Sequence, residues 1–181
     1  MKEVSVKGQS GNRMSSSAEP QQPEGRILAL DLGQKRVGVA LCDELLISIT
    51  RLTPILRTNW KQLLVDVAQL VQQHNARALV VGLPLSLDGT NDSAAAAARQ
   101  SAENLARSLS LPVFLQDERL TSVAAAEQLR EAGHNPKEVA QLIDSEAAAI
   151  ILADFLGSKT KTRVSRDVAD DAAQSLRLDE Y

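Results

Sequence analysis

The stretch 27-ILALDLGQKRVGVAL-41 joins two apolar runs by a short turn and carries an aspartate near the end of the first run. The apolar runs 26–32 and 36–42, separated by Gly33-Gln34-Lys35, predict a β-hairpin. The first run is apolar at every position before Asp31, as in a central strand covered on both faces. Burying an ionised carboxylate there is costly without a partner. Either Lys35 or Arg36 pairs with Asp31, or Asp31 lies in the turn, or it has a functional role.

Beyond the hairpin, the hydrophobic periodicity alternates between that of strands and that of helices. It predicts further strands over 46–56, 78–85 and 112–118, and helices over 92–109, 121–133 and 136–156. Another helix begins after Asn59, which suits its N-cap, and Asn135-Pro136 suits the start of the last helix. This order predicts an α/β fold with a mixed five-stranded sheet, three antiparallel strands followed by two parallel ones, and helices on both faces.

Composition and charge fit one soluble domain. The 181 residues are 44% hydrophobic, 24% charged and 2% aromatic, and the net charge of -3 does not support a strong electrostatic grip on nucleic acid or on a membrane. A single cysteine makes no internal disulfide, which fits a reducing cytoplasm. We expect a disordered tail over 1–25, a folded domain over 26–156, a flexible C-terminal extension over 157–181, and no membrane span.

Further acids also lie where an ionised carboxylate is costly to bury. Asp117 and Glu118 end the last predicted strand, and because neighbours on a strand point to opposite faces, only one of them can face the same side as Asp31. The pattern alone leaves that choice open. Asp144 lies on a helix that is apolar around most of its surface, next to alanines that allow close approach to the sheet. The alternative is that Asp144 belongs to a single solvated stripe on that helix.

These acids can meet if the strands ending at Asp31 and at Glu118 lie near each other and the last helix packs on the same face. Clustered carboxylates repel one another unless a cation lies among them, and Mg²⁺ and Mn²⁺ prefer oxygen ligands. Such a site typically attacks a phosphodiester in line, with metal ions activating water and stabilising the leaving oxygen. The sequence therefore predicts a metal-dependent hydrolase with Mg²⁺ or Mn²⁺ as cofactor.

Four segments in this order resemble the YqgF/RuvX family of pre-16S rRNA nucleases: 29-ALDLGQKRVGVAL-41, 80-VVGLPLSLDGT-90, 116-QDERLTS-122 and 143-IDSEAAAIIL-152. The family is similar to RuvC-type Holliday-junction resolvases and has an RNase H-like fold. The resemblance covers about 26–156. It implies that the acidic catalytic and metal-binding residues are Asp31, Glu118 and Asp144, which selects Glu118 over Asp117. It also implies a nuclease that matures the 5′ end of 16S rRNA in a bacterial cytoplasm.

Weaker candidates surround these acids. Lys35 and Arg36 in the hairpin turn could contact a nucleic-acid backbone, and Arg119 could position a phosphate. Each is equally a solvated or neutralising charge. In the loop SLDGT, the hydroxyls of Ser86 and Thr90 and the backbone of Gly89 could contact phosphate, or the loop could simply cap the next helix.

The sequence is compatible with more than one function. The expected partner is nucleic acid, either pre-16S rRNA or branched DNA, and the protein could be a monomer or a homodimer. A non-catalytic RNA-binding or ribosome-assembly module is an alternative. An actin/Hsp70-like nucleotide binder is another, because DLGQKRVGVAL resembles the first phosphate loop of those proteins, but they need two such domains and this chain is long enough for one.

Overall fold

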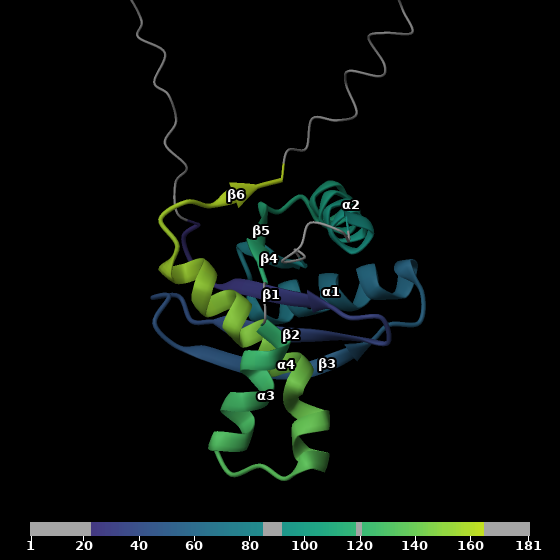
Figure 1. Cartoon of the computed structure of the whole chain (residues 1–181). Helices are drawn as coiled ribbons and strands as arrows, with labels where there is room; N and C mark the ends of the chain where they lie inside the picture. Colours follow the sequence, from purple (N-terminus) through teal and green to yellow (C-terminus); the bar gives the residue numbers. More distant parts are fainter. Residues whose placement is uncertain (1–22, 85–91, 119–120, 165–181) are drawn as a thin grey trace, which may run out of the picture.

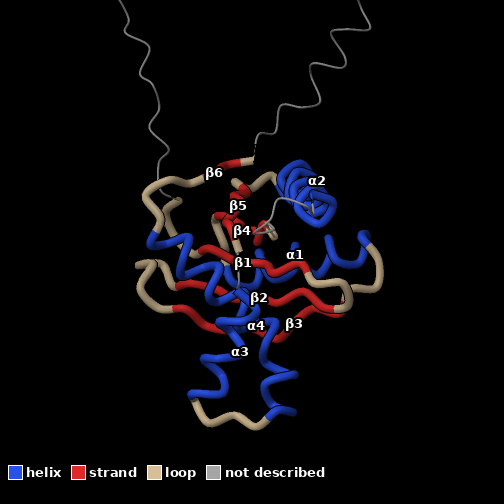
Figure 2. The backbone as a smooth tube through the Cα atoms, in the orientation of Figure 1, coloured by secondary structure: helices blue, strands red, loops and turns tan. Residues whose placement is uncertain are grey.

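The computed structural model describes residues 23–84, 92–118 and 121–164. The elements follow the order strand-strand-strand-helix-strand-helix-strand-helix-helix-strand. They are β1 (Ile27–Leu32), β2 (Arg36–Cys42), β3 (Ile49–Leu56), α1 (Trp60–His74), β4 (Ala78–Leu83), α2 (Asp92–Leu109), β5 (Val113–Asp117), α3 (Thr121–Glu131), α4 (Pro136–Gly157) and β6 (Thr162–Arg163). Figure 1 labels each of them, and Figure 2 separates helices from strands by colour.

The strands form one mixed sheet in the order β3-β2-β1-β4-β5-β6. β1, β2 and β3 pair antiparallel, and β4 and β5 extend the sheet parallel to β1. The predicted α/β fold class and strand directions are confirmed. The sheet has six strands rather than five, because Thr162 and Arg163, in the segment expected to be flexible, pair antiparallel with β5.

Helices cover both faces of the sheet, as predicted (Figures 1 and 2). One core lies between the sheet and helices α1 and α2, and it includes Leu28, Leu30, Leu63 and Leu105. The other lies between the sheet and the C-terminal half of α4, where Ala148, Ile151 and Phe155 pack among small strand residues. Every second residue of β1 therefore faces α4 and the others face α1 and α2, which explains why β1 is apolar at every position before Asp31.

Local signals in the sequence fix the helix ends. Asn59 caps α1 by accepting from the Gln62 amide at 2.9 Å, and Asn135 opens α4 with a capping box closed by Glu138. Both caps were predicted from the sequence. The α3–α4 hairpin extends beyond the sheet on the side of β3, where Leu129 and Val139 form a small core of their own (Figure 1).

The C-terminal end of α4 is held by a buried lysine. Lys161 Nζ donates to the carbonyl oxygens of Phe155 at 2.5 Å and Ser158 at 3.1 Å, and it lies 4.2 Å from the centre of the Phe155 ring. These contacts fold the chain back from α4 so that β6 reaches the edge of β5. In the described part of the chain, no helix is long and apolar enough to cross a membrane.

Candidate active site

Three parallel strands end at the same edge of the sheet, and two of the predicted acids lie there. Asp31 is the fifth residue of β1, and Glu118 follows the last residue of β5, with its amide donating to the Leu83 carbonyl at 3.2 Å. Crevices at the carboxyl ends of parallel strands are the usual ligand sites of α/β sheets. Asp31 is half-buried in this structure rather than fully buried.

β1 and β5 are not neighbours, because β4 runs between them. Leu30 pairs with Val81, so Gly82 follows at the level of Asp31, and Gly82 also pairs with Gln116 of β5. A Cβ at position 82 would overlap Oε2 of Glu118 and would crowd Ile151 of α4. The missing side chain of Gly82 therefore gives the Glu118 carboxylate room to reach toward Asp31 across the intervening strand.

A second strand glycine brings in α4. Gly38 of β2 pairs with Asp31, and a Cβ at this position would overlap the carbonyl oxygen of Asp144. The helix backbone thus rests directly on the strand, beside the β1 acid. The sequence predicted close approach from the alanines of α4, and Ala147 and Ala148 are indeed buried. Asp144 itself lies over the face of the sheet, against Gly38 of β2.

Polar contacts to β3 hold this part of α4 in register. Ser145 Oγ donates to the Leu52 carbonyl at 2.6 Å. Arg51 forms a two-pronged ion pair with Glu146, with Nη2 2.7 Å from Oε1 and Nε bonded to Oε2. Glu146 is 3% exposed, so this pair satisfies a carboxylate that would otherwise be costly to bury. Both contacts involve residues that directly follow Asp144 and therefore limit its movement.

Burial and neighbouring acids raise the pKa values of Asp31 and Glu118. Burial, and then the charge of Asp144, raise the pKa of Asp31 to about 6. Burial, followed by the charges of Asp31 and Asp117, raises the pKa of Glu118 to about 8. Asp31 is thus the central member, coupled to Glu118 on one side and to Asp144 on the other. Strongly perturbed carboxyls of this kind concentrate at functional sites.

The donor set fits a hard cation. The Asp144 carboxylate has Oδ2 2.7 Å from Arg36 Nε, yet this solvent-inaccessible oxygen accepts no hydrogen bond from the described residues. An oxygen that has an ion-pair partner but no aligned hydrogen bond, beside acids that repel each other, would be stabilised by a divalent ion. Within residues 23–84, 92–118 and 121–164, no three acidic, histidine or cysteine side chains are grouped closely enough to hold an ion. The acids form two pairs, Glu118 with Asp31 and Asp31 with Asp144, and the three carboxylates do not surround one common point.

The other predicted residues have different outcomes. Arg36 joins the site through its ion pair with Asp144, so its first partner is an acid of the site. Lys35 is exposed in the turn between β1 and β2. The remaining candidates lie outside the described residues: Ser86, Gly89, Thr90 and Arg119.

Sequence reasoning missed three residues that shape the site. Gly38 and Gly82 each lie inside an apolar strand, where a glycine signals close backbone or side-chain approach, and that signal was available. Arg57 follows β3 and binds the β1–β2 turn. Its Nη1 donates to the Gly33 carbonyl at 3.0 Å, and its amide donates to the Lys35 carbonyl at 2.9 Å. No local pattern marks Arg57, because its neighbours in space are distant in sequence.

Comparison with known proteins identifies the family to which this chain belongs. A family model described as "RuvX: Holliday junction resolvase" matches residues 25–158. The chain belongs to the RuvX family. Among RuvX relatives, a "Putative pre-16S rRNA nuclease" of Syntrophus aciditrophicus is 37% identical over 80% of this chain and 97% of the relative. One of the same description from Gloeothece citriformis is 43% identical over 76% of this chain and 91% of the relative.

The fold of this RuvX chain is also shared with a solved resolvase. The structure titled "T. thermophilus RuvC in complex with Holliday junction substrate" superposes with a TM-score of 0.50, covering 77% of this chain and 99% of that chain. At 15% identity this likeness shows the fold alone. It agrees with the RNase H-like architecture that the sequence resemblance implied.

Proposed function

We propose that this protein is a metal-dependent nuclease that hydrolyses phosphodiester bonds in structured RNA, and that its substrate is the 5′ end of pre-16S rRNA in the cytoplasm. The observation that carries the proposal is the position of Asp31, coupled to Glu118 across Gly82 and to Asp144 across Gly38. The substrate assignment follows the description of the relatives, each of which is named "Putative pre-16S rRNA nuclease".

The three acids would hold Mg²⁺ or Mn²⁺. When bound, the cation supplies positive charge that lowers the pKa of the attacking water and stabilises the leaving oxygen. The protein supplies the fixed carboxylates, because Asp31 and Glu118 lie at the ends of two parallel strands of one sheet, and Asp144 is held by the contacts of α4 to β3. Near neutral pH without a cation, Glu118 retains its proton, since its pKa is about 8. Glu118 would release that proton if it held a cation.

Arg36 is placed to restrain the Asp144 carboxylate. Its Nε lies 2.7 Å from Oδ2, and its side chain is 41% exposed. A guanidinium in an ion pair at this distance restrains the orientation of the carboxylate. We infer that Arg36 orients a metal ligand, which is a different role from the phosphate contact that the sequence suggested.

A second candidate activity is the resolution of branched DNA. It is favoured by the description of the matching family model and by the fold shared with a RuvC bound to a Holliday junction. Both activities require the same acids, so the site does not separate them. They differ in symmetry, since a symmetric junction needs two active sites and hence a dimer, whereas trimming one RNA end does not.

The decisive experiment offers end-labelled 16S precursor RNA and a synthetic four-way DNA junction side by side, with Mn²⁺ or Mg²⁺. Asp31→Asn and Asp144→Asn should each abolish cleavage. Glu127→Gln, which changes an exposed acid on α3, should leave cleavage unchanged. Cleavage that persists equally in the two aspartate variants would overturn the assignment of the site, and the substrate that is cut selects the activity.

A further inference from the structure

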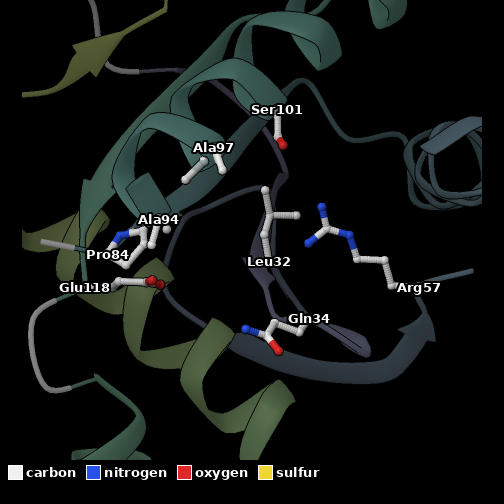
Figure 3. Close-up of a pocket in the computed structure, with 10 residues that line it drawn as sticks. Leu32, Gln34, Arg57, Pro84, Ala94, Ala97, Ser101 and Glu118 are labelled. Atoms are coloured by element: carbon white, nitrogen blue, oxygen red, sulfur yellow. The ribbon is translucent and has the colours of Figure 1, made fainter. Parts of the chain in front are cut away.

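A pocket of about 210 Å³ opens beside the acids, between α2 and the ends of β1 and β4 (Figure 3). Glu118 and Arg57 enter it from opposite sides, and Leu32 lies between them. The wall formed by α2 carries small side chains, including Ala97 and the hydroxyl of Ser101. The pocket is therefore mainly apolar, with an acid of the proposed active site at one end and a cation at the other.

Arg57 is fixed in place before any ligand arrives. Its backbone amide and its Nη1 are both bonded to the β1–β2 turn, through the carbonyls of Lys35 and Gly33. A guanidinium carries several N–H donors in a rigid fork, so the bond to Gly33 leaves others directed at the pocket. This arrangement matches the geometry of a phosphate oxygen pair.

The pocket size limits what can enter. Pockets for drug-sized ligands usually measure roughly 300–1,000 Å³, so one of about 210 Å³ suits a single base or sugar. Leu32 and the alanines of α2 offer apolar contact to the flat face of such a group. A base in a stacked duplex cannot enter, because it must first leave its neighbours.

We propose that this pocket binds one unpaired nucleotide next to the scissile phosphate, with its base against α2 and its phosphate on Arg57. The position of the scissile phosphate beside Glu118 rests on the proposed nuclease function. The pocket then acts as a specificity device: it directs cleavage to places where a nucleotide is unpaired and can leave the stack. Sequence-selective RNA recognition commonly uses such exposed bases.

The first test measures binding without any cleavage. Adenosine 5′-monophosphate is titrated into the full chain, and the backbone amide signals of Ala94, Ala97 and Ala98 are followed by NMR. Saturable shifts are expected in the wild type. Arg57→Ala should weaken binding roughly tenfold, as expected for a hydrogen bond to a charged group. Ribose 5-phosphate, which lacks the base, shows which part of the nucleotide the pocket selects.

A matched pair of variants locates the site. Ala97→Phe fills the pocket from an exposed helix position, whereas Ala96→Phe makes the same change on the next exposed residue, which does not line the pocket. Ala97→Phe should abolish the AMP shifts and Ala96→Phe should retain them. Absence of saturable shifts in the wild type, or equal loss in both variants, would overturn the proposal whatever the nuclease assay shows.

The second test uses cleavage of a substrate with one abasic position beside the cut site. The abasic substrate should be cut more slowly by the wild type, and Ala97→Phe should cut the intact substrate equally slowly. In Ala97→Phe the abasic change should cause no further loss, because both changes remove the same interaction. Additive losses would contradict the proposal. Binding of AMP without cleavage of any substrate would support the nucleotide-binding pocket and contradict the proposed nuclease function.

Discussion

Gly38 and Asp144 meet backbone to backbone, although one lies on β2 and the other on α4. A Cβ on residue 38 would occupy the position of the Asp144 carbonyl oxygen. Because Gly38 is also the strand partner of Asp31, this single contact places the helix acid beside the strand acid. The geometry of the site thus depends on two side chains that are absent, those of Gly38 and Gly82.

Gly38→Ala is expected to damage both stability and activity. The added methyl group meets backbone, which cannot turn aside, so α4 must shift, and overpacking of this kind costs about 1–3 kcal/mol. Cleavage should fall by tenfold or more, because Asp144 moves with the helix. Urea unfolding and single-turnover cleavage measure the two effects. Gly157→Ala is the control, since nothing lies within 4 Å of a Cβ there and no loss is expected.

Glu118→Gln should alter how stability depends on pH in chelated, metal-free protein. The pKa of Glu118 rises from 4.5 to about 8 on folding, so the folded state holds a proton that the unfolded state has lost. Its contribution to stability is complete below the unfolded pKa and is lost as pH rises through the folded pKa. The variant should therefore equal wild type at about pH 3.5, below the unfolded pKa, and melt higher near about pH 9.

Thermal unfolding across that pH range, with Glu127→Gln as the exposed-acid control, measures the difference. A constant offset between Glu118→Gln and wild type at all pH values would contradict the prediction. Addition of Mg²⁺ at the alkaline end should raise the melting temperature of the wild type and have little effect on the variant, because a ligand that binds only the folded state stabilises it.

Asp31→Asn should stabilise the metal-free protein while removing cleavage. The folded pKa of about 6 against 3.8 means that the ionised acid is disfavoured by burial and by Asp144, an effect worth about 1–3 kcal/mol at neutral pH. Chemical denaturation in the presence of a chelator measures the gain. A loss of stability would show that Asp31 supports the fold, and that its ionised carboxylate is not disfavoured in the folded protein.

The Arg51–Glu146 pair offers a test of how α4 is held. Arg51→Met leaves Glu146 buried without its partner and should cost roughly 3 kcal/mol, whereas the double variant Arg51→Met/Glu146→Leu should recover much of that loss. A double-mutant cycle from urea unfolding gives the coupling. Equal destabilisation by the single and double variants would mean that packing, and not the ion pair, fixes the helix against β3.

Much of the fold was accessible from the sequence because hydrophobic period and caps are local properties. The β1–β2 hairpin, the alternating strands and helices, and the N-caps Asn59 and Asn135 all follow from residues close together in the chain. The third strand begins at Ile49 rather than at residue 46, because Asp43 Oδ1 accepts from the amides of Ile47 and Ser48 and closes a turn. β6 has two residues, which are too few to show a hydrophobic periodicity.

The site was predictable in its residue types and not in its geometry. Alternation along β5 puts Glu118 on the same face of the sheet as Phe114. Phe114 packs toward α4, so once Phe114 is placed, the sequence also gives the face of Glu118. The order of the strands does not follow, since no local pattern shows that β4 separates β1 from β5. Ion pairs such as Arg36–Asp144 depend on that order and so required the structure.

The short strand β6 sets a practical limit on how far the protein can be trimmed. A chain cut after Gly157, where α4 ends, would lose Lys161 and the bond from the Val164 amide to the Val113 carbonyl. The Phe155 ring would then lose the ammonium that covers it, and β5 would present an unpaired edge, which is a template for aggregation. An expression boundary placed after Val164 keeps that edge closed.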